Sequence, residues 1–502
     1  MKRPLLLSSL AAFALVLAGP RIGAAAVSPR QDAAVAFFGP THVHQIHLVF
    51  TPEQWDAMEP TRRPNQGFPG PGGGPGGPGG PNRGGPMNLS SRFEQGDAQR
   101  PGVAGAMGID FNYVEADVEI GTQRVSRVGV RYKGNGTYMG SQSMDKRPLK
   151  LDFNRFVKGQ EFLGLRSLNL HNHVVDKTCL REALGHEMAR ELGIPAPRTA
   201  YAQVQVTIIG RHERVPLGLY TITEQPNDDF LKRWFGSKKG VLMKPGSADG
   251  LRYRGDDWSA YEKPLNVQED GTPAEQQRVI AFLKLLAEAS DEDFARQVGD
   301  YVDLEQMGKF LALNVGLVNL DSILTLGQNY YLHLAPNGRL HAWLWDLDNC
   351  WGAFGFMGSP EQRVALSIAQ PWIGDSRIVQ RLLKVEECRK HYREALRQLF
   401  TGPLEPARFR ERIGSLSAFL RPLLEQESPE ALAQFESAVY GTPAGAAGQN
   451  FGPFSMANIA MVDFVERRGK SVLDQLAGTS EGEVLEGGFP GGPRGPGGRG
   501  GM

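Results

Sequence analysis

Residues 319–355 carry the polar side chains whose types and spacing suggest chemistry. Asp321 follows an apolar run, and Asn329 opens the strand-like segment NYYLHL. The turn sequence PNG then leads into RLHAWLWDLD, which ends at Asp346 and Asp348. Two apolar segments around such a turn indicate a β-hairpin. We expect the hairpin to bring Asp321, Asn329 and Asp346 to one end of a sheet.

Oxygen donors grouped in this way favour phosphate chemistry. Mg²⁺ prefers one or two carboxylates together with phosphate oxygens. Phosphoryl transfer also needs one acidic group that can accept a proton and another that holds the metal. The segment therefore predicts a phosphoryl-transfer site that uses Mg²⁺ or Mn²⁺.

A glycine-rich turn lies between two predicted strands upstream. The sequence KGNGT contains Gly134 and Gly136, and the strand-like RPLKLDF follows with Lys150 between two leucines. Glycines let backbone amides approach a phosphate closely, and a lysine on an adjoining strand can reach its oxygens. A hairpin turn with an exposed lysine is the alternative interpretation, and this segment alone does not decide between them.

A helix is predicted to follow over residues 178–192. Asp176 or Thr178 can cap its start, and Gly193 followed by Pro195 ends it. Its leucine, alanine and methionine side chains recur at helical spacing and form one apolar stripe.

Two acids on this helix, Glu182 and Glu187, are candidates to pair with Lys150 and hold it toward a phosphate. The helical periodicity does not choose between them. A solvated position on the helix surface is the alternative for either acid.

The pattern of elements predicts an α+β protein. Strand-like alternation dominates residues 109–224, whereas residues 273–318 and three long segments after residue 355 have helical spacing. Residues 64–100 are rich in Gly and Pro and cannot bury apolar area, so we interpret them as a disordered insertion. The Gly/Pro/Arg-rich residues 481–502 are interpreted as a disordered tail.

The N-terminus has the pattern of a signal peptide. Lys2 and Arg3 precede the apolar run LLLSSLAAFALVLAG, and Ala24 to Ala26 offer a cleavage site after Ala26. A single membrane anchor is the alternative, although the run is short for a bilayer span. No later segment is apolar and long enough to cross a membrane, so we expect export to a periplasm, cell envelope or extracellular space.

Charge and cysteine content exclude some classes of function. The chain has 55 basic and 55 acidic residues, without the basic excess of a general nucleic-acid binder. Its three cysteines, Cys179, Cys350 and Cys388, match no zinc pattern and form no disulfide framework, although one disulfide is possible.

Taken together, these segments resemble the CotH family, named for spore coat protein H, a group of atypical kinase-like proteins. The resemblance covers roughly residues 110–470 and rests on the order of several pieces: VGVRYKGNGT, KRPLKLDF, LREALGHEMARELGIPAPRTAY, PLGLYTITEQPNDDFL, GVLMKP, NLDSILTLGQNYYLHL and WLWDLDNCWGAFG. It implies a divergent two-lobed protein-kinase-like fold that moves the γ-phosphoryl group of ATP onto a protein. We predict a strand and helix segment at 27–63, a β-rich kinase-like N-lobe at 101–226 and a mostly helical C-lobe at 227–480.

The resemblance also implies roles for particular residues. Asp321 corresponds to the catalytic-loop acid and Asp346 to the metal-holding acid. Lys150 and Glu182 correspond to the ion pair on the nucleotide side, with Gly134 and Gly136 closing over the phosphates. For the second metal ligand, geometry suggests Asn329, with Asp348 as the rival.

The sequence departs from the protein-kinase pattern at several positions. Leu320 and Ser322 flank Asp321, where a kinase catalytic loop has Arg before its Asp, and Asn329 follows eight residues later rather than five. WDLDNCWG stands where a kinase has DFG. We expect a protein kinase that acts on Ser or Thr of a secreted or envelope protein. The alternatives are a non-catalytic surface or adhesion module and a phosphotransferase for a small or carbohydrate substrate.

Overall fold

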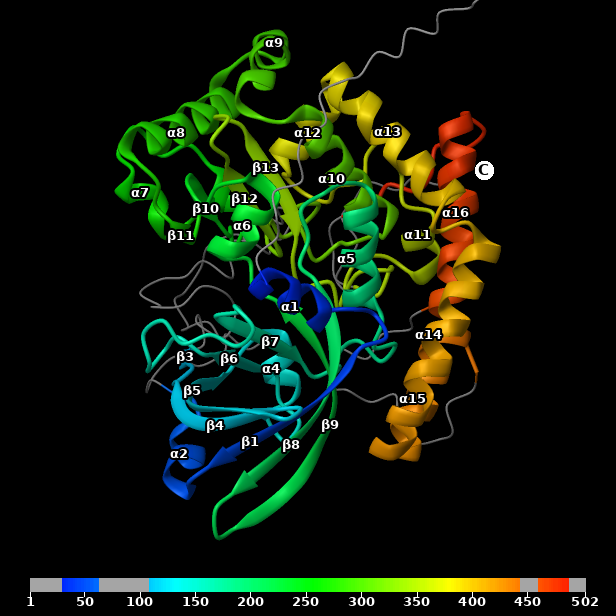
Figure 1. Ribbon diagram of the computed structural model, residues 1–502. Coiled ribbons are helices and arrows are strands. Elements are labelled where there is room, and N and C mark those ends of the chain that lie inside the picture. The colour runs from blue at the N-terminus through cyan, green and yellow to red at the C-terminus, as the bar shows by residue number, and fades with distance from the viewer. Residues whose placement is uncertain (1–28, 63–107, 443–458, 487–502) are drawn as a thin grey trace, which may run out of the picture.

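The computed structural model describes residues 29–62, 108–442 and 459–486. The predicted signal peptide and the Gly/Pro-rich residues 64–100 lie outside these ranges. Of the tail predicted to be disordered at 481–502, residues 487–502 also lie outside them. The prediction is wrong for residues 481–486, which pack on the helical half: the Glu483 amide donates to the Ala365 carbonyl at 2.7 Å, and Leu485 is buried. The described chain mixes a β-barrel with many helices, which confirms the α+β class (Figure 1). No helix in these ranges combines the length and apolar character that a membrane crossing requires.

Seven strands close the barrel in the order β1-β4-β5-β6-β7-β9-β8. Their bounds are β1 Val43–Phe50, β4 Val114–Ile120, β5 Gln123–Tyr132, β6 Leu149–Asp152, β7 Ser167–His171, β8 Thr199–Ile208 and β9 His212–Glu224. Each neighbouring pair is antiparallel except β1 and β8, which run parallel. The segment 27–63, which the sequence sets apart, therefore supplies the strand that closes the barrel.

Alternating side chains explain how the barrel fills its interior and leaves a polar outer face. In β6, Leu149 and Leu151 are buried, whereas Lys150 and Asp152 between and beside them are half-buried. Successive side chains of a strand point to opposite faces, so the apolar ones gather inside and the polar ones outside. Short elements complete this part: α1 Pro29–Phe37, α2 Pro52–Ala57, β2 Thr61–Arg62, β3 Ile109–Asp110 and α4 Gly136–Gly140.

The second half of the chain builds a four-stranded sheet, ordered β11-β10-β12-β13, that is packed among helices. The strands are β10 Val241–Met243, β11 Val267–Glu269, β12 Tyr330–Leu334 and β13 Leu340–Leu344. The helices are α6 Asp228–Phe235, η2 Ala248–Leu251, α7 Ser259–Glu262, α8 Pro273–Glu288, α9 Asp291–Tyr301, α10 Leu304–Gly316, α11 Pro360–Val364, α12 Arg377–Lys384, α13 Glu386–Thr401, α14 Pro406–Glu427, α15 Pro429–Tyr440 and α16 Met461–Ala477.

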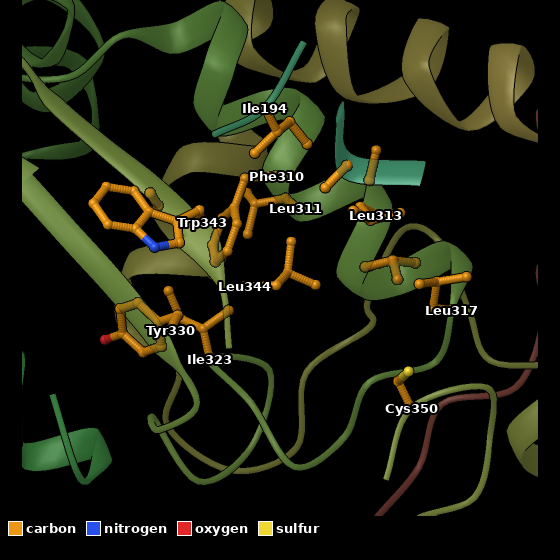
Figure 2. Close-up of a cluster of buried hydrophobic side chains, with 14 of the residues drawn as sticks. Ile194, Phe310, Leu311, Leu313, Leu317, Ile323, Tyr330, Trp343, Leu344 and Cys350 are labelled. Atoms are coloured by element: carbon orange, nitrogen blue, oxygen red, sulfur yellow. The ribbon is translucent and has the colours of Figure 1, made fainter. Parts of the chain in front are cut away.

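The predicted hairpin is confirmed, and a hydrophobic core fixes it in place. β12 and β13 pair antiparallel from Tyr330 opposite Leu344 to Leu334 opposite Leu340. Phe310 of α10 packs among the side chains of this hairpin (Figure 2). Each fully buried leucine or phenylalanine side chain contributes about 1.5–3 kcal/mol relative to an exposed one. The same cluster holds Cys350, and all three cysteines of the chain are free and buried.

The helix predicted from residue 178 is observed as α5, Arg181–Glu191. The Asp176 carboxylate accepts hydrogen bonds from the backbone amides of Thr178 (3.0 Å) and Arg181 (2.9 Å). Thr178 precedes the helix, whereas Arg181 is its first residue, so the second bond satisfies an amide that the first turn leaves without an intrahelical partner. α5 lies between the barrel and the helices of the second half, and it contacts β8, β13 and α10 (Figure 1).

Helix α14 ties both α5 and the barrel to the second half. Arg412 forms an ion pair with Glu187 of α5 at 2.7 Å. At the other end of the helix, Glu427 pairs with Lys146 at 2.5 Å and accepts a hydrogen bond from the Leu219 amide at 2.7 Å. Gly218 has a φ of 97°, and a Cβ there would collide with the Glu427 carboxylate. Only glycine therefore lets this acid approach the β9 backbone.

We predict that Glu427→Ala lowers the free energy of unfolding by about 1–3 kcal/mol, because the variant leaves the Leu219 amide and the Lys146 amine without their partner. Chemical denaturation measures the loss. The matched control is Glu425→Ala on the same helix, where the side chain is exposed and the expected change is below about 0.5 kcal/mol. Equal losses in the two variants would contradict the role of Glu427.

Candidate active site

Three aspartates from two loops form an acidic cluster, in which Asp321 and Asp348 are buried and Asp346 is half-buried. Asp321 lies in the loop after α10, and Asp346 and Asp348 follow β13. The Asn349 amide donates to the Asp321 carboxylate at 3.2 Å and to the Asp348 carboxylate at 3.1 Å, so one side chain joins the two loops. The structure thus brings together the three acids that the sequence singled out.

The backbone around the cluster explains how the acids meet. The Asn329 side chain donates to the Asp321 carbonyl at 2.9 Å, and the Asn329 carbonyl accepts from the Trp345 amide at 3.0 Å. Asn329 and Asp346 have φ values of 60° and 59°, in the left-handed region that Asn and Asp tolerate better than most residues. These bonds and bends attach the Asp321 loop to the end of the hairpin.

Burial and mutual repulsion raise the pKa values of the acids. Burial raises the pKa of Asp321 to about 7, and repulsion from Asp346 adds to the rise. The hydrogen bond from Gln328 lowers this pKa but does not outweigh burial. Burial also raises the pKa of Asp348 well above its ordinary value, and Asp346 and Asp321 add to the rise. Burial raises the pKa of Asp346 too, although Lys133 opposes the rise.

The cluster fits a bound divalent cation. None of the ion pairs among the described residues involves Asp321, Asp346 or Asp348, so no side chain neutralises these acids at close range. In the described part of the chain, no three His, Cys, Asp or Glu side chains are placed to hold a metal ion together, so at most two of these aspartates can bind one ion. Two carboxylates with open positions suit Mg²⁺, which takes its remaining ligands from water and phosphate.

The two predicted candidates for the second metal ligand both lie at this cluster. The side-chain amide of Asn329 donates to the Asp321 backbone carbonyl. Asp348 and Asp321 both accept hydrogen bonds from the Asn349 side chain. The choice between them stays a prediction. Sequence reasoning missed Asn349, although its position directly after Asp348 was a signal that it could share the site.

Two lysines face the acids, and the sequence analysis gave neither of them a role. The Lys133 Nζ lies 5.8 Å from the centroid of the Trp345 ring, and the Lys244 Nζ lies 5.1 Å from the same centroid. Both lysines lower the pKa of Asp346, the residue after that tryptophan. Lys133 directly precedes Gly134, and this position beside the glycine turn was the signal that could have identified it.

The predicted ion pair between Lys150 and Glu182 is wrong. The Lys150 Nζ instead donates to the Gln225 side chain at 3.4 Å, and no ion pair among the described residues joins it to Glu182. The strand register gives the reason. Lys150 of β6 lies opposite Asn169 of the neighbouring strand β7. Glu182 lies near His171, which is two residues farther along β7.

Lys150 nevertheless belongs to the positive side of the site. It lies directly across from Arg131 in the β5–β6 pair, and Lys133 follows Arg131 by two residues. Burial lowers the pKa of Lys150 to about 8, and repulsion from Arg131 and Lys133 adds to the fall. Arg131, Lys133 and Lys150 thus form a group of cations on one side of the barrel.

Glu182 binds the segment Asp346–Asp348, which carries two of the three clustered acids. Its carboxylate accepts from the Leu347 backbone amide at 2.7 Å, between Asp346 and Asp348, and from the Thr223 hydroxyl at 3.3 Å. His186 lies 3.2 Å from the same carboxylate. Burial by itself would raise the pKa of Glu182. The nearby histidines and the Leu347 amide outweigh burial and hold this pKa below its usual range. The rival acid, Glu187, is bound by Arg412, so it is not a partner of Lys150 either.

The glycine turn directly follows Lys133. Gly134 has a φ of 85°, and a Cβ there would collide with the Thr137 hydroxyl, so the turn requires glycine at this position. Gly136 begins the short helix α4, and a Cβ there would meet open space. Of the two predicted glycines, the conformation therefore demands only Gly134.

The fold and the site define a class: an α+β protein in which cations beside a β-barrel face a buried group of aspartates. Comparison with known families adds a specific match. The sequence model described as "CotH kinase protein" matches residues 130–472, most of the chain. The chain belongs to this CotH kinase family, which confirms the resemblance and supports a kinase-related protein. A search of curated proteins found no match to the chain.

We predict that Asp321→Asn stabilises the metal-free protein at pH 8 and has a smaller effect at pH 5. The raised pKa means that the folded state holds a proton which the unfolded state releases above about pH 4. Stability is therefore lost as pH rises toward 7, at up to about 1.4 kcal/mol per pH unit. Asparagine removes this loss. Thermal melts in chelator at both pH values measure the difference, and an equal effect at both would contradict a raised pKa for Asp321.

Proposed function

We propose that this protein is an ATP-dependent phosphotransferase that moves the γ-phosphoryl group onto Ser or Thr of a secreted or envelope protein, with Mg²⁺ or Mn²⁺ as the metal. One observation carries the proposal: Lys133 and Lys244 face Asp346 beside a cluster of acids that has no close counter-ion. A triphosphate with its metal has the charge pattern that matches such a site, because phosphate oxygens bind the lysines and the metal binds the carboxylates.

Each side chain has a proposed role. Asp321 positions the acceptor hydroxyl and takes its proton, and its pKa of about 7 suits proton transfer near neutrality. Asp346 holds the metal together with Asp348 or Asn329. The metal, when bound, neutralises charge on the phosphates. Lys133 and Lys244 bind phosphate oxygens, and the turn at Gly134 brings backbone amides close to them.

The proposed arrangement has two lobes, as in protein kinases. The barrel would form the N-lobe and the helical half the C-lobe, with α5 between them. Two separate hydrophobic clusters support this division, one inside the barrel and one through the helices and the four-stranded sheet. Glu182 of α5 acts here on the metal-holding segment through the Leu347 amide, which differs from the lysine pairing expected from the sequence.

The choice of acceptor and compartment rests on the sequence. The signal-peptide pattern at the N-terminus supports export, and the equal numbers of acidic and basic residues argue against a nucleic-acid substrate. Export also places the protein where ATP is scarce. The competing proposal is therefore a surface-binding module that keeps the fold without catalysis.

We predict that Asp346→Ala and Asp321→Asn each reduce transfer of labelled γ-phosphate by at least about 100-fold, since each removes a group that acts directly on the reaction. The measurement is incorporation of label into a Ser/Thr-containing acceptor with Mg²⁺ or Mn²⁺. Asp300→Asn, at an exposed aspartate of α9, is the control and should retain full transfer. Wild-type protein that binds no nucleotide would favour the surface-binding module instead.

We predict that Lys133→Met weakens the binding of a non-hydrolysable ATP analogue by about 10- to 100-fold, whereas Lys150→Met weakens it by less than about 5-fold. Lys133 lies beside Trp345 and lowers the pKa of Asp346, so its charge is felt at the acids. The Lys150 amine instead donates a hydrogen bond to Gln225. Titration calorimetry measures both affinities. The reverse order would restore Lys150 to the role expected from the sequence.

A further inference from the structure

Between Lys133 and Glu182 lies a third side chain, the imidazole of His171. The Lys133 Nζ is 3.1 Å from His171 Nε2, and the same nitrogen is 3.8 Å from the Glu182 carboxylate. No ion pair within the described ranges joins Lys133 directly to an acid. Among the described residues, the hydrogen-bond partner of this amine is therefore a ring nitrogen.

The chemistry of the two groups fixes the direction of this hydrogen bond. In the protonated form of Lys133 the ammonium can only donate, so His171 Nε2 accepts and the ring proton lies on Nδ1. Burial and the neighbouring Lys133 lower the pKa of His171 to about 3, so the ring is neutral near pH 7. A neutral ring with a free lone pair on Nε2 is the form that can accept from Lys133.

The Glu182 carboxylate is already occupied by other donors. It accepts from the Leu347 amide and the Thr223 hydroxyl, and His186 lies within hydrogen-bonding distance. Glu182 acts on Lys133 through its charge alone, across the imidazole. Two other cations act on this group: repulsion from Arg131 lowers the pKa of Lys133, and Lys244 shares the Trp345 ring with Lys133.

We propose that His171 is a positioning residue that holds the Lys133 amine at the phosphate-binding side of the site by accepting its hydrogen bond. This inference rests on the proposed function, because it assigns Lys133 to the phosphates. The imidazole and the Trp345 ring restrain the amine, so the lysine does not need direct contact with the glutamate. Glu182 is then free to hold the Leu347 amide and, with it, the acids on either side.

The test measures the pKa of Lys133 by NMR of isotope-labelled lysine in the purified protein, with the signal assigned through Lys133→Met. Burial already lowers this pKa, and loss of the acceptor should lower it further. We expect H171L to lower it by at least about 1 unit and to weaken binding of the ATP analogue at least tenfold. H171Q restores an acceptor near the Nε2 position, so both quantities should return close to wild type.

The control is His173→Leu, at a second buried histidine on the same segment that bonds to the Thr221 hydroxyl instead. It should lower the melting temperature without changing the pKa of Lys133. If H171L does not fold, H171N makes the same test, because its shorter side chain has no group at the Nε2 position.

Each outcome decides the role of His171. An unchanged pKa of Lys133 in H171L, or an equal change in His173→Leu, overturns the proposal. A lowered pKa with rescue by H171Q supports it, even if the wild-type protein binds no nucleotide. In that last case the proposed function fails while the positioning of Lys133 by His171 stands.

Discussion

The buried hydrogen bond from the Leu347 amide to the Glu182 carboxylate is the constraint on which the rest of the site depends. It fixes the peptide between Asp346 and Asp348 to helix α5, and it is 2.7 Å long. The same carboxylate accepts from Thr223 at the end of β9, so one acid links the barrel, the helix and the acidic segment. A buried carboxylate is costly unless its acceptor positions are filled, and here they are.

The hydrogen bond from the Leu347 amide to Glu182 depends on the contacts that fix the position of α5. Asp176 caps its first turn, Arg412 of α14 binds Glu187 on it, and α14 in turn reaches the barrel through Glu427 at Gly218. The apolar side chains of α5 lie in the hydrophobic cluster of the helical half, and polar contacts through Thr223 and α14 connect the helix to the barrel. A shift of α5 relative to either one would move Glu182 and, through Leu347, the aspartates. The distance between the lysines and the acids is therefore set by contacts that lie well away from both.

Several side-chain amides surround the acidic cluster and donate hydrogen bonds to it. Gln328, Asn329 and Asn349 donate to the side chain or carbonyl of Asp321, and no cation lies close enough to form an ion pair with it among the described residues. Neutral donors stabilise a carboxylate without cancelling its charge. Under the proposed function this keeps Asp321 available to the acceptor hydroxyl, because a permanent arginine or lysine partner would compete for its carboxylate.

Much of this could be predicted from the residues alone. The hairpin, the helix at α5 and the meeting of Asp321 with Asp346 and Asp348 follow from local patterns: alternation, turn chemistry, capping and the polar ends of strands. Family membership followed from the order of such segments, and the comparison confirmed it. These features depend on neighbours in sequence, so the sequence by itself determined them.

The partners across the site were decided only by the tertiary structure. Lys150 lies on β6 and Lys133 directly follows the neighbouring strand β5, and the strand register directs one toward Gln225 and the other toward His171. Likewise Glu182 and Glu187 share one helix, and the packing of α14 against it assigns the second to Arg412. Register and helix packing depend on residues far apart in the chain, so no local pattern could have chosen between the two lysines or the two glutamates.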